Sequence, residues 1–372
     1  MKITDVRAQQ LKSTDMEFKY TEAWTPSQVG MILFRVTGED GHEGHCVTWL
    51  AAAGQTEDLL PRIRRALVGR DIHDVEAISL ELTGRLSAPN AVYSAIDIAL
   101  WDLIGKHHET PVYQLLGAAR HELRAYASTV YYPTIQEYID LALECRAEGF
   151  DAYKLHPFGV PDKDIALCRA VREAVGDTMD LMLDPVNAYD RQGAMKVGRV
   201  LDELDFYWFE APIPDTDIQG LAELTSKLDL PVAAAESVSG GLLQYPQYLS
   251  THVLDSLRGV GDWVGGISAM RKAAALCEAY GVKYEPHSYG TTSIQAAHFA
   301  VMLSIHNCDF LELPVPTGIL DHGMKNTLRV EKDGTVAAPT LPGLGYEIDE
   351  DEMDNLTVRE LAVSSGNTLH GL

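Results

Sequence analysis

The sequence predicts an α/β protein in which a TIM-like barrel of parallel strands follows a smaller N-terminal domain. Between Leu123 and about residue 321, short apolar runs alternate with amphipathic segments, as expected for the strands and helices of a parallel fold. Three of these runs end in an acidic residue, Asp184, Glu210 and Glu236, at even intervals of 26 residues. One strand, one helix and two loops take roughly that many residues. An open sheet would spread these acids along one edge, whereas a barrel brings them together at its mouth, so the pattern favours the barrel.

Composition and charge limit the classes of partner. The chain has 372 residues and an apolar content of 46%, enough for a barrel with a large core and a capping domain. The formal net charge of −24 argues against nucleic acid or an anionic membrane as a partner, so an anionic substrate must be captured by local positive charge. Five scattered cysteines without a CxxC pair indicate reduced thiols and a cytoplasmic setting. We expect neither a signal peptide nor a membrane span, because no apolar run is long enough.

The first third of the chain is expected to form a separate α+β unit. Residues 1–50 have the pattern of antiparallel strands, with Met31–Val36 as one strand followed by a glycine-rich turn. An aromatic-rich loop, Met16–Pro26, either covers a site or packs on its own domain. Residues 55–117 are predicted to be helical, because apolar side chains recur at helical spacing through Ala91–Lys106.

Eight apolar runs are the candidate strands of the barrel. They lie near residues 124–131, 151–156, 179–184, 206–210, 231–236, 252–260, 281–287 and 308–313. Amphipathic helices are expected between them, for example at Thr134–Glu148 and Asp164–Val175. Beyond about residue 321 the chain becomes rich in turns. We therefore divide the chain into an N-terminal domain (1–121), a barrel (122–322) and a C-terminal segment (323–372).

Several polar side chains are predicted to meet at the mouth of this barrel. The three strand-end carboxylates would repel one another unless a cation held them, and hard oxygen ligands in that number suit Mg²⁺ or Mn²⁺. Lys154 and His156 follow the second strand at a spacing of two, which puts both on one face. His287 and Glu312 close the seventh and eighth strands. The cavity would thus hold metal ligands, a lysine and two imidazoles.

These features occur in an order that resembles the mandelate racemase subgroup of the enolase superfamily. The matching stretches are 95–106, 111–117, the three acids, Gly265-Gly266-Ile267, His287 and 342–346, and they extend over nearly the whole chain. Each stretch is weak by itself, whereas their order and spacing together are specific. The resemblance implies a (β/α)7β barrel with an α+β N-terminal capping domain, which the C-terminal tail returns to complete.

The resemblance also implies a metal-assisted reaction. Asp184, Glu210 and Glu236 stand at the positions of the family's metal ligands and would hold one Mg²⁺ per active site, with Mn²⁺ as the alternative. In the family this ion chelates a substrate carboxylate. Removing the α-proton of a carboxylate creates a dianionic enediolate, which is too unstable in water unless fixed positive charge meets its oxygens.

The resemblance also assigns roles to the side chains around this metal ion. Lys154 would neutralise the substrate carboxylate, and His156 would replace a basic lysine as the base, because imidazole titrates near neutrality. The alternatives are a surface lysine and a supporting histidine. His287 matches the histidine of a His–Asp dyad, although the alternative is a satisfied core histidine. The dyad position itself is Val260, which is compatible with His287 acting as a general acid.

Further residues are expected to support His287 or to contact the substrate. Asp262 and Glu285 are the candidate partners of His287 in place of Val260. Glu312 is expected to be protonated by burial and to donate to a substrate carboxylate oxygen, with a structural role as the alternative. Tyr20 and Trp24, in the aromatic loop, are expected to contact substrate, together with the loop near 49–54 and the turn at 288–292.

The sequence is compatible with three functions. The first is a hydro-lyase that dehydrates an aldonate or aldarate to a 2-keto-3-deoxy acid. The second is a racemase, epimerase or lactone cycloisomerase that uses the same enediolate, and the third is a non-catalytic carboxylate-binding protein. We expect a small-molecule substrate, no nucleic acid or membrane partner, and a homo-oligomer between a dimer and an octamer. The sequence does not encode which sugar acid is bound.

Overall fold

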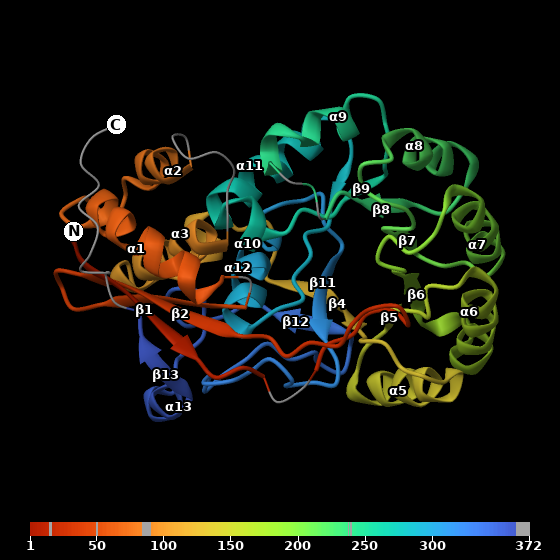
Figure 1. Cartoon of the computed structure of the whole chain (residues 1–372), viewed down its shortest axis with the longest axis horizontal. Helices are drawn as coiled ribbons and strands as arrows, with labels where there is room; N and C mark the ends of the chain where they lie inside the picture. The colour runs from red at the N-terminus through yellow and green to blue at the C-terminus, as the bar shows by residue number, and fades with distance from the viewer. Residues whose placement is uncertain (15–16, 50, 84–90, 237, 239, 362–372) are drawn as a thin grey trace.

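The chain folds into a cap built on an antiparallel sheet and a barrel built on parallel strands (Figure 1). The computed structural model describes residues 1–372 except 15–16, 50, 84–90, 237, 239 and 362–372. The α/β barrel with a separate N-terminal antiparallel sheet, expected from the sequence, is confirmed. Among the residues described, no helix is both long and apolar enough to cross a membrane. The five cysteines are buried and carry no disulfide.

In the part of the chain that the structure describes, the cap combines four antiparallel strands with four helices. Its sheet has the order β13-β1-β2-β3. The strands are β1 (Ile3–Leu11), β2 (Met31–Gly38), β3 (Glu43–Thr48) and β13 (Thr357–Glu360), and the helices are α1 (Ala53–Leu67), α2 (Val75–Thr83), α3 (Ala91–His107) and α4 (Val112–Leu115). Helix α3 is apolar on nearly every side because it packs against β2 and β3 on one side and against barrel helix α11 on the other.

One close approach fixes α3 on the cap sheet. A Cβ atom built on Gly44, in β3, would lie 1.9 Å from the carbonyl oxygen of Ala99, in α3. Only glycine leaves room for the two backbones at this distance. The turn between β2 and β3 is therefore held firmly against the C-terminal half of α3.

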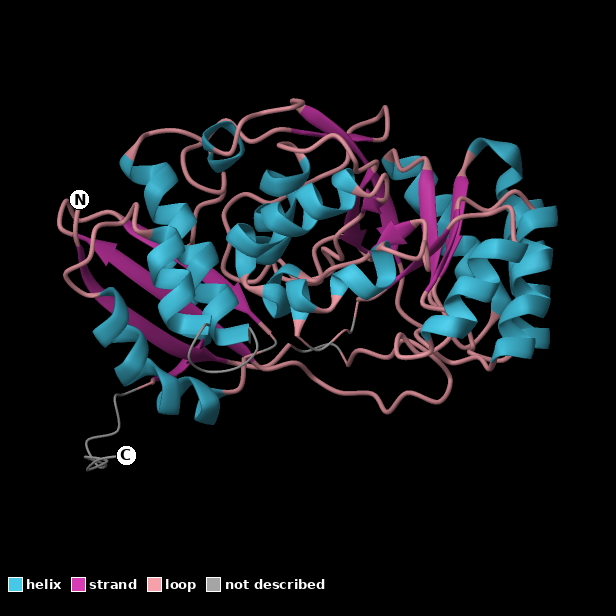
Figure 2. Ribbon diagram, turned by 90° about the horizontal axis from the view of Figure 1, so that it is seen from above, coloured by secondary structure: helices cyan, strands magenta, loops and turns pink. Residues whose placement is uncertain are grey.

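The barrel alternates strands and helices, and its helices lie outside the strands (Figures 1 and 2). The strands are β4 (Glu122–Ser128), β5 (Ala152–Leu155), β6 (Asp180–Leu183), β7 (Trp208–Glu210), β8 (Val232–Ala234), β9 (Ser256–Leu257), β10 (Lys283–Tyr284) and β11 (Phe310–Pro314). The helices are α5 (Ile135–Glu148), α6 (Pro161–Val175), α7 (Arg191–Glu203), α8 (Ile218–Lys227), α9 (Tyr245–Leu249), α10 (Gly261–Val264), α11 (Gly266–Ala279) and α12 (Thr292–Met302). Each predicted strand is present, although β9 and β10 are only two residues long.

Local sequence explains where the outer helices begin. Helix α5 starts at Thr134, whose side chain accepts from the Glu137 backbone while the Glu137 carboxylate accepts from the Thr134 backbone. Helices α7 and α8 begin after Asp190 and Asp217, whose carboxylates accept backbone N–H groups of the first turn. These caps set the lengths of the loops that carry the candidate site.

The barrel has a seam between its seventh and eighth strands. The hydrogen-bonded ladder of the described residues runs in the order β10-β9-β8-β7-β6-β5-β4-β11, without a strand pairing between β10 and β11. Side chains bridge the gap. The Glu285 carboxylate accepts the backbone N–H groups of Asp309 (2.6 Å) and Phe310 (3.2 Å). On the other side, Ser288 Oγ accepts the backbone N–H of Glu312 and donates to its carbonyl oxygen.

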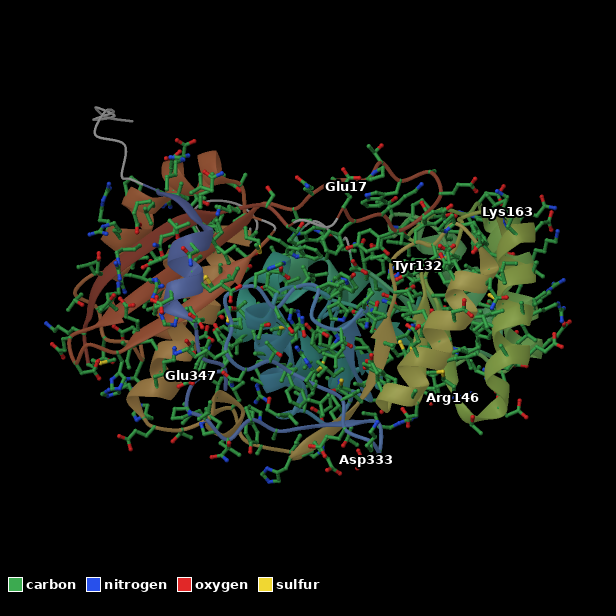
Figure 3. All side chains as sticks on the ribbon, turned by 90° about the horizontal axis from the view of Figure 1, so that it is seen from below. Glu17, Tyr132, Arg146, Lys163, Asp333 and Glu347 are labelled. Atoms are coloured by element: carbon green, nitrogen blue, oxygen red, sulfur yellow. The ribbon has the colours of Figure 1, made fainter. Side chains whose placement is uncertain are left out.

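The C-terminal segment contacts both parts of the molecule. Its strand β12 (Thr335–Ala337) pairs antiparallel with the start of β4, at the end of the barrel opposite to the mouth. After helix α13 (Glu350–Leu356), strand β13 pairs with β1 of the cap. Figure 3 places Glu17, on the cap loop, and Asp333, just before β12, on opposite edges of the molecule. The cap loop and the β12 turn thus approach the barrel from opposite ends.

Candidate active site

The candidate site lies where the carboxyl ends of the parallel strands meet. Lys154 lies in β5 and His156 directly follows it, while Asp184 follows β6 and Glu210 ends β7. Further around the barrel come Glu236, Arg258, His287 and Glu312, each at or just after its strand. Since the strands run parallel, all of these side chains reach the same end of the barrel.

Three carboxylates form the centre of the site. Oxygen atoms of Asp184, Glu210 and Glu236 lie within 4.8 Å of one another. Burial and the charges of the other two carboxylates raise the pKa of Glu236 well above its ordinary value. The pKa of Asp184 is lowered instead. Burial alone would raise this pKa, but His156 and Lys154 outweigh burial and lower it to about 2. Such a crowded set of hard oxygen donors fits a divalent cation such as Mg²⁺.

The backbone around these acids is strained. Val186, Ala211 and Ala235 have φ values of 51°, 36° and 72°, in the left-handed region that L-residues other than Asn and Asp rarely enter. Each lies within two residues of one of the three acids. Strain of this kind persists where the surrounding structure imposes it, and it is concentrated at functional sites.

A buried ionic layer lies beneath the three carboxylates. The Lys154 ammonium, with no exposed surface, lies 2.7 Å from Glu312 Oε1, 3.0 Å from Glu210 Oε2 and 3.5 Å from Asp184 Oδ2. Arg258 Nε lies 2.7 Å from Glu210 Oε1, and its Nη2 lies 2.9 Å from Glu312 Oε2. Together with Glu236, four carboxylates thus meet two permanent cations. One divalent ion would cancel the remaining surplus of two negative charges.

The surroundings of Lys154 and Glu312 differ from those expected. Burial opposes the charged form of Lys154, but Glu210 and Glu312 outweigh it and raise the pKa of the amine above its ordinary value. Burial likewise opposes ionisation of Glu312, yet Lys154, His287 and Arg258 hold its pKa well below the ordinary value. The protonated Glu312 predicted from the sequence is therefore not supported. Neither side chain is among those that line the cavity at the mouth.

Arg258 was not recognised in the sequence. It is fully buried and also donates to Tyr126 Oη (2.9 Å) and to the Glu285 carbonyl oxygen (2.7 Å). Its strand, β9, is only two residues long, so the strand end had no clear mark. One sequence feature could have pointed to Arg258. It is the only charged residue between Ser256 and Val260, where the other residues are apolar or small.

The two histidines lie on opposite sides of the carboxylates. His156 Nε2 is 3.2 Å from Asp184 Oδ2, and the ring of Tyr20 lies over it with centroids 5.1 Å apart. His287 Nε2 is 3.8 Å from Glu236 Oε1, and its ring stacks on Tyr289 at 6.3 Å. Burial lowers the pKa of His287 to about 3. The two strands that carry these residues, β5 and β10, are separated by β6 to β9 in the ladder.

The carboxylate expected beside His287 is a different one. Among the described residues, Glu236 is the acid within ion-pair distance of His287. Glu285 is turned toward the seam, where it holds the backbone before β11. Asp262 lines the cavity, and burial raises its pKa to about 7, but its Oδ2 has no hydrogen-bond partner among the described residues. The position of the missing dyad acid, Val260, lines the same cavity.

A cavity of about 250 Å³ opens above the carboxylates. Barrel residues form its floor, including His156, Asp184, Glu236 and His287. The cap supplies an aromatic wall of Phe18, Tyr20, Trp24, Trp49 and, from the barrel turn, Tyr289. Tyr20 and Trp24 thus lie over the mouth of the barrel, and Asn187 and Val186 line the cavity as well. Met16 and residue 50 of the predicted cap loops lie outside the described residues.

Comparison with known proteins identifies the family. Residues 14–117 match the N-terminal domain of the mandelate racemase / muconate lactonizing enzyme family, and residues 137–352 match the enolase C-terminal domain-like family. The chain belongs to the enolase superfamily. The resemblance inferred from its motifs is confirmed, and the chain is an enzyme of this superfamily.

Relatives within the superfamily act in two ways. L-Talarate/galactarate dehydratase of Salmonella typhimurium is 30% identical over 273 residues, which are 70% of this chain and 68% of the relative. D-Galactarolactone cycloisomerase of Agrobacterium fabrum is 30% identical over 312 residues, 77% of this chain and 81% of the relative. The crystal structure of D-glucarate dehydratase from Agrobacterium tumefaciens complexed with magnesium has a TM-score of 0.83 at 29% identity and covers 96% of this chain and 100% of that one. Lyases and isomerases are the two enzyme classes expected from the sequence.

Proposed function

We propose that this superfamily member is a Mg²⁺-dependent dehydratase of an aldonate or aldarate, which yields a 2-keto-3-deoxy acid. The observation that carries the proposal is the placement of two imidazoles, His156 and His287, on opposite sides of a three-carboxylate cluster at the floor of a cavity. Dehydration needs two proton transfers, one from the α-carbon and one to the departing hydroxyl, and two separate groups suit this better than one.

Asp184, Glu210 and Glu236 are proposed to hold the ion. When bound, Mg²⁺ would supply positive charge to the oxygens of the substrate carboxylate as the α-proton leaves. The structural support is the fit of the donor set: three convergent carboxylates and a surplus of negative charge. Lys154 and Arg258 are proposed to hold Glu210 in place from below, because each binds one of its oxygens. Carboxylate oxygens have spare lone pairs, so these contacts leave Glu210 able to bind a cation.

The two histidines are proposed to share the proton transfers. The sequence predicts that His156 is the base and that His287 is the acid. The burial of His287 lowers its pKa to about 3, so its ring is neutral at neutral pH and does not carry the proton that a general acid must donate. Lys154 remains a cation among its carboxylates, which disfavours it as a base. Tyr20 and Trp24 are proposed to cover the substrate and keep water out.

The test is a library of aldonates and aldarates incubated with the enzyme and Mg²⁺. Semicarbazide traps a 2-keto acid, so an absorbing semicarbazone is expected with one or a few stereoisomers and is expected to vanish in EDTA. A protein with measured Mg²⁺ binding that forms no semicarbazone from any acid sugar would contradict the dehydratase proposal. The same mixtures in D₂O show by NMR whether an α-proton exchanges without loss of water.

A cycloisomerase or epimerase is the second candidate. It is favoured by the cycloisomerase relative, which aligns over more of this chain than the dehydratase does, and by Val260 at the position of the dyad acid. Such an enzyme would convert a lactone or an epimer into an isomer of equal mass. Mass spectrometry distinguishes the two, because only dehydration removes 18 mass units, the mass of one water molecule, from an acid sugar.

A further inference from the structure

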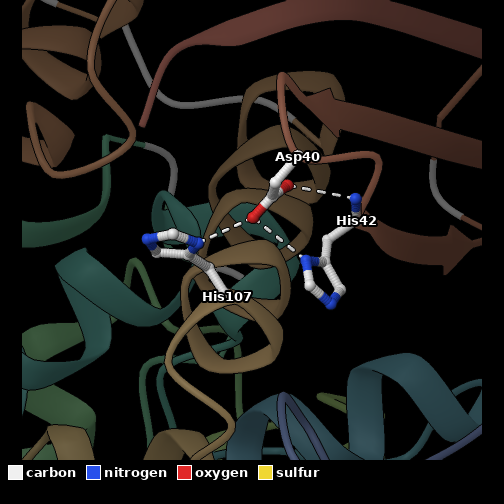
Figure 4. Close-up of side chains that lie close together, drawn as sticks. All are labelled: Asp40, His42 and His107. Carbon is white, nitrogen blue, oxygen red and sulfur yellow. Dashed lines mark hydrogen bonds and ion pairs between the residues drawn. The ribbon is translucent and has the colours of Figure 1, made fainter.

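A second group of metal-ligating side chains lies on the cap. Asp40 and His42 belong to the turn between β2 and β3, and His107 is the last residue of α3. In Figure 4 the Asp40 carboxylate lies between the two imidazoles. Asp40 Oδ2 is 2.7 Å from His107 Nδ1 and 3.0 Å from His42 Nδ1, while Asp40 Oδ1 accepts the His42 backbone N–H at 3.1 Å.

The scaffold under these three residues is rigid. Two residues after His42, Gly44 allows the backbone of β3 to touch Ala99 of α3. The Lys106 ammonium donates to the carbonyl oxygen of Glu43 at 2.9 Å, so the turn is also tied to the last turn of the helix. The turn and the helix end are thus positioned before any ligand arrives, which lowers the entropic cost of binding.

We propose that Asp40, His42 and His107 form a binding site for a late first-row transition-metal ion, with Zn²⁺ as its representative. The three ligand atoms lie within 4.8 Å of one another. Zinc takes imidazole nitrogen and carboxylate oxygen at about 2.0–2.2 Å in tetrahedral geometry, which places neighbouring ligand atoms roughly 3.3 Å apart. The distances from Asp40 Oδ2 to the two imidazole nitrogens, 2.7 Å and 3.0 Å, therefore need to open by only a few tenths of an ångström, and the two nitrogens lie within 4.8 Å of each other. His42, whose side chain is 48% exposed, is free to make this adjustment.

The chemistry of the ligands sets the class of ion. Two imidazoles and one carboxylate suit Zn²⁺, Ni²⁺ or Cu²⁺, whereas Mg²⁺ prefers an all-oxygen shell. On binding, the ion would take the Nδ1 lone pair of each ring, leaving the ring proton on Nε2, and water would complete the shell. The site lies at the C-terminus of the 17-residue helix α3, where the partial negative charge of the last carbonyl groups favours a cation.

Two further histidines, His73 and His108, lie close to this site. His73 and His108 approach each other with Nε2 atoms 2.7 Å apart, and the rings of His107 and His108 have centroids 4.9 Å apart. We assign the site to the Asp40 group, because among the described residues outside the barrel it is the group whose three ligand atoms all lie within 4.8 Å of one another.

The test measures metal binding directly and does not depend on activity. The full chain, freed of any affinity tag, is titrated with Zn²⁺ in excess Mg²⁺, which occupies the proposed barrel site, and binding is followed by competition with a chromophoric chelator. One equivalent is expected to bind in the wild type. His42→Asn and His107→Asn are each expected to weaken it at least about tenfold. Circular dichroism checks that the variants fold.

Two controls distinguish this site from others. His252→Asn removes an exposed barrel histidine and is expected to leave binding unchanged, and His73→Asn is expected to change it less than about twofold. Co²⁺ in place of Zn²⁺ should give the visible absorption of a tetrahedral nitrogen and oxygen site, lost in His107→Asn. The proposal is overturned if the wild type binds no equivalent under these conditions, if both Asp40-facing variants bind like the wild type, or if His73→Asn alone abolishes binding.

Discussion

Replacement of Arg258 by leucine tests the buried ionic layer most directly. Arg258 has 1% exposed surface and is the cation shared by Glu210 and Glu312, with further bonds to Tyr126 and the Glu285 carbonyl. Leucine is apolar and smaller than arginine, and it leaves two buried carboxylates with Lys154 as their remaining cation. Removing one partner of a buried pair typically costs about 3–5 kcal/mol. We expect a loss of this size in the free energy of unfolding at neutral pH.

The pH dependence supplies a second, independent sign. Glu312 has a folded-state pKa below its unfolded value of about 4.3, so it contributes stability that is present above that pH and is lost as the pH falls through the folded pKa. Without Arg258 the pKa of Glu312 rises toward the unfolded value. The difference between wild type and variant should thus be largest at neutral pH and shrink in acid.

The assay is urea unfolding in EDTA, followed by tryptophan fluorescence at several pH values. Arg124→Leu is the matched control, because Arg124 pairs with Asp151 and Asp180 at the opposite end of the barrel but is 41% exposed. Exposed pairs contribute less than about 1 kcal/mol. If Arg258→Leu costs no more than Arg124→Leu, or if its cost is the same in acid as at neutral pH, the reasoning about the buried layer is wrong.

Three further predictions concern the site. Glu236→Gln should weaken Mg²⁺ binding at least about tenfold by calorimetry, since it removes one of three anionic donors; unchanged affinity would contradict the metal assignment. If His287 is the base, His287→Asn should stop α-proton exchange in D₂O, whereas His156→Asn should keep this exchange but lose dehydration. Each lost rate should fall by about 10²–10⁴-fold. The reverse outcome would make His156 the base, and near-wild-type turnover in either variant would make that histidine structural. Glu312→Gln, which keeps an acceptor for Arg258, should retain more stability than Glu312→Leu, as measured by thermal unfolding; equal losses would argue that the charge-assisted bonds matter little.

The sequence was sufficient for the features that repeat. Strand-end acids at even spacing located the mouth of the barrel, because a parallel strand always delivers its last side chain to the same end. The pair Lys154 and His156 could be placed on one face for the same reason. The resemblance added the cap and the returning tail, which have no periodic mark of their own.

Features that depend on packing could not be predicted in this way. The burial of Lys154 and Glu312 against Arg258 follows from how three strands approach in space, and the sequence suggested instead a protonated Glu312. The partner of His287 was sought among nearby acids in the sequence, Asp262 and Glu285. The structure brings Glu236 there from a strand about fifty residues earlier, a contact that only barrel closure creates.

The seam between β10 and β11 is the place where we expect the barrel wall to open most easily. Proteins open locally where few backbone bonds must break, and the rest of the structure stays folded during such events. Along this seam, among the described residues, parting the two strands breaks the bonds of Glu285 and Ser288, the backbone bond from Tyr284 to Asn307, the bond from the Asn307 side chain to the Val282 carbonyl oxygen and the ion pair of Lys283 with Asp309. The loop that carries His287 starts at this seam, directly after Glu285. We therefore expect local opening of the barrel to occur beside His287, whereas the backbone of His156 is held by hydrogen bonds with the side chains of Thr129 and Tyr138.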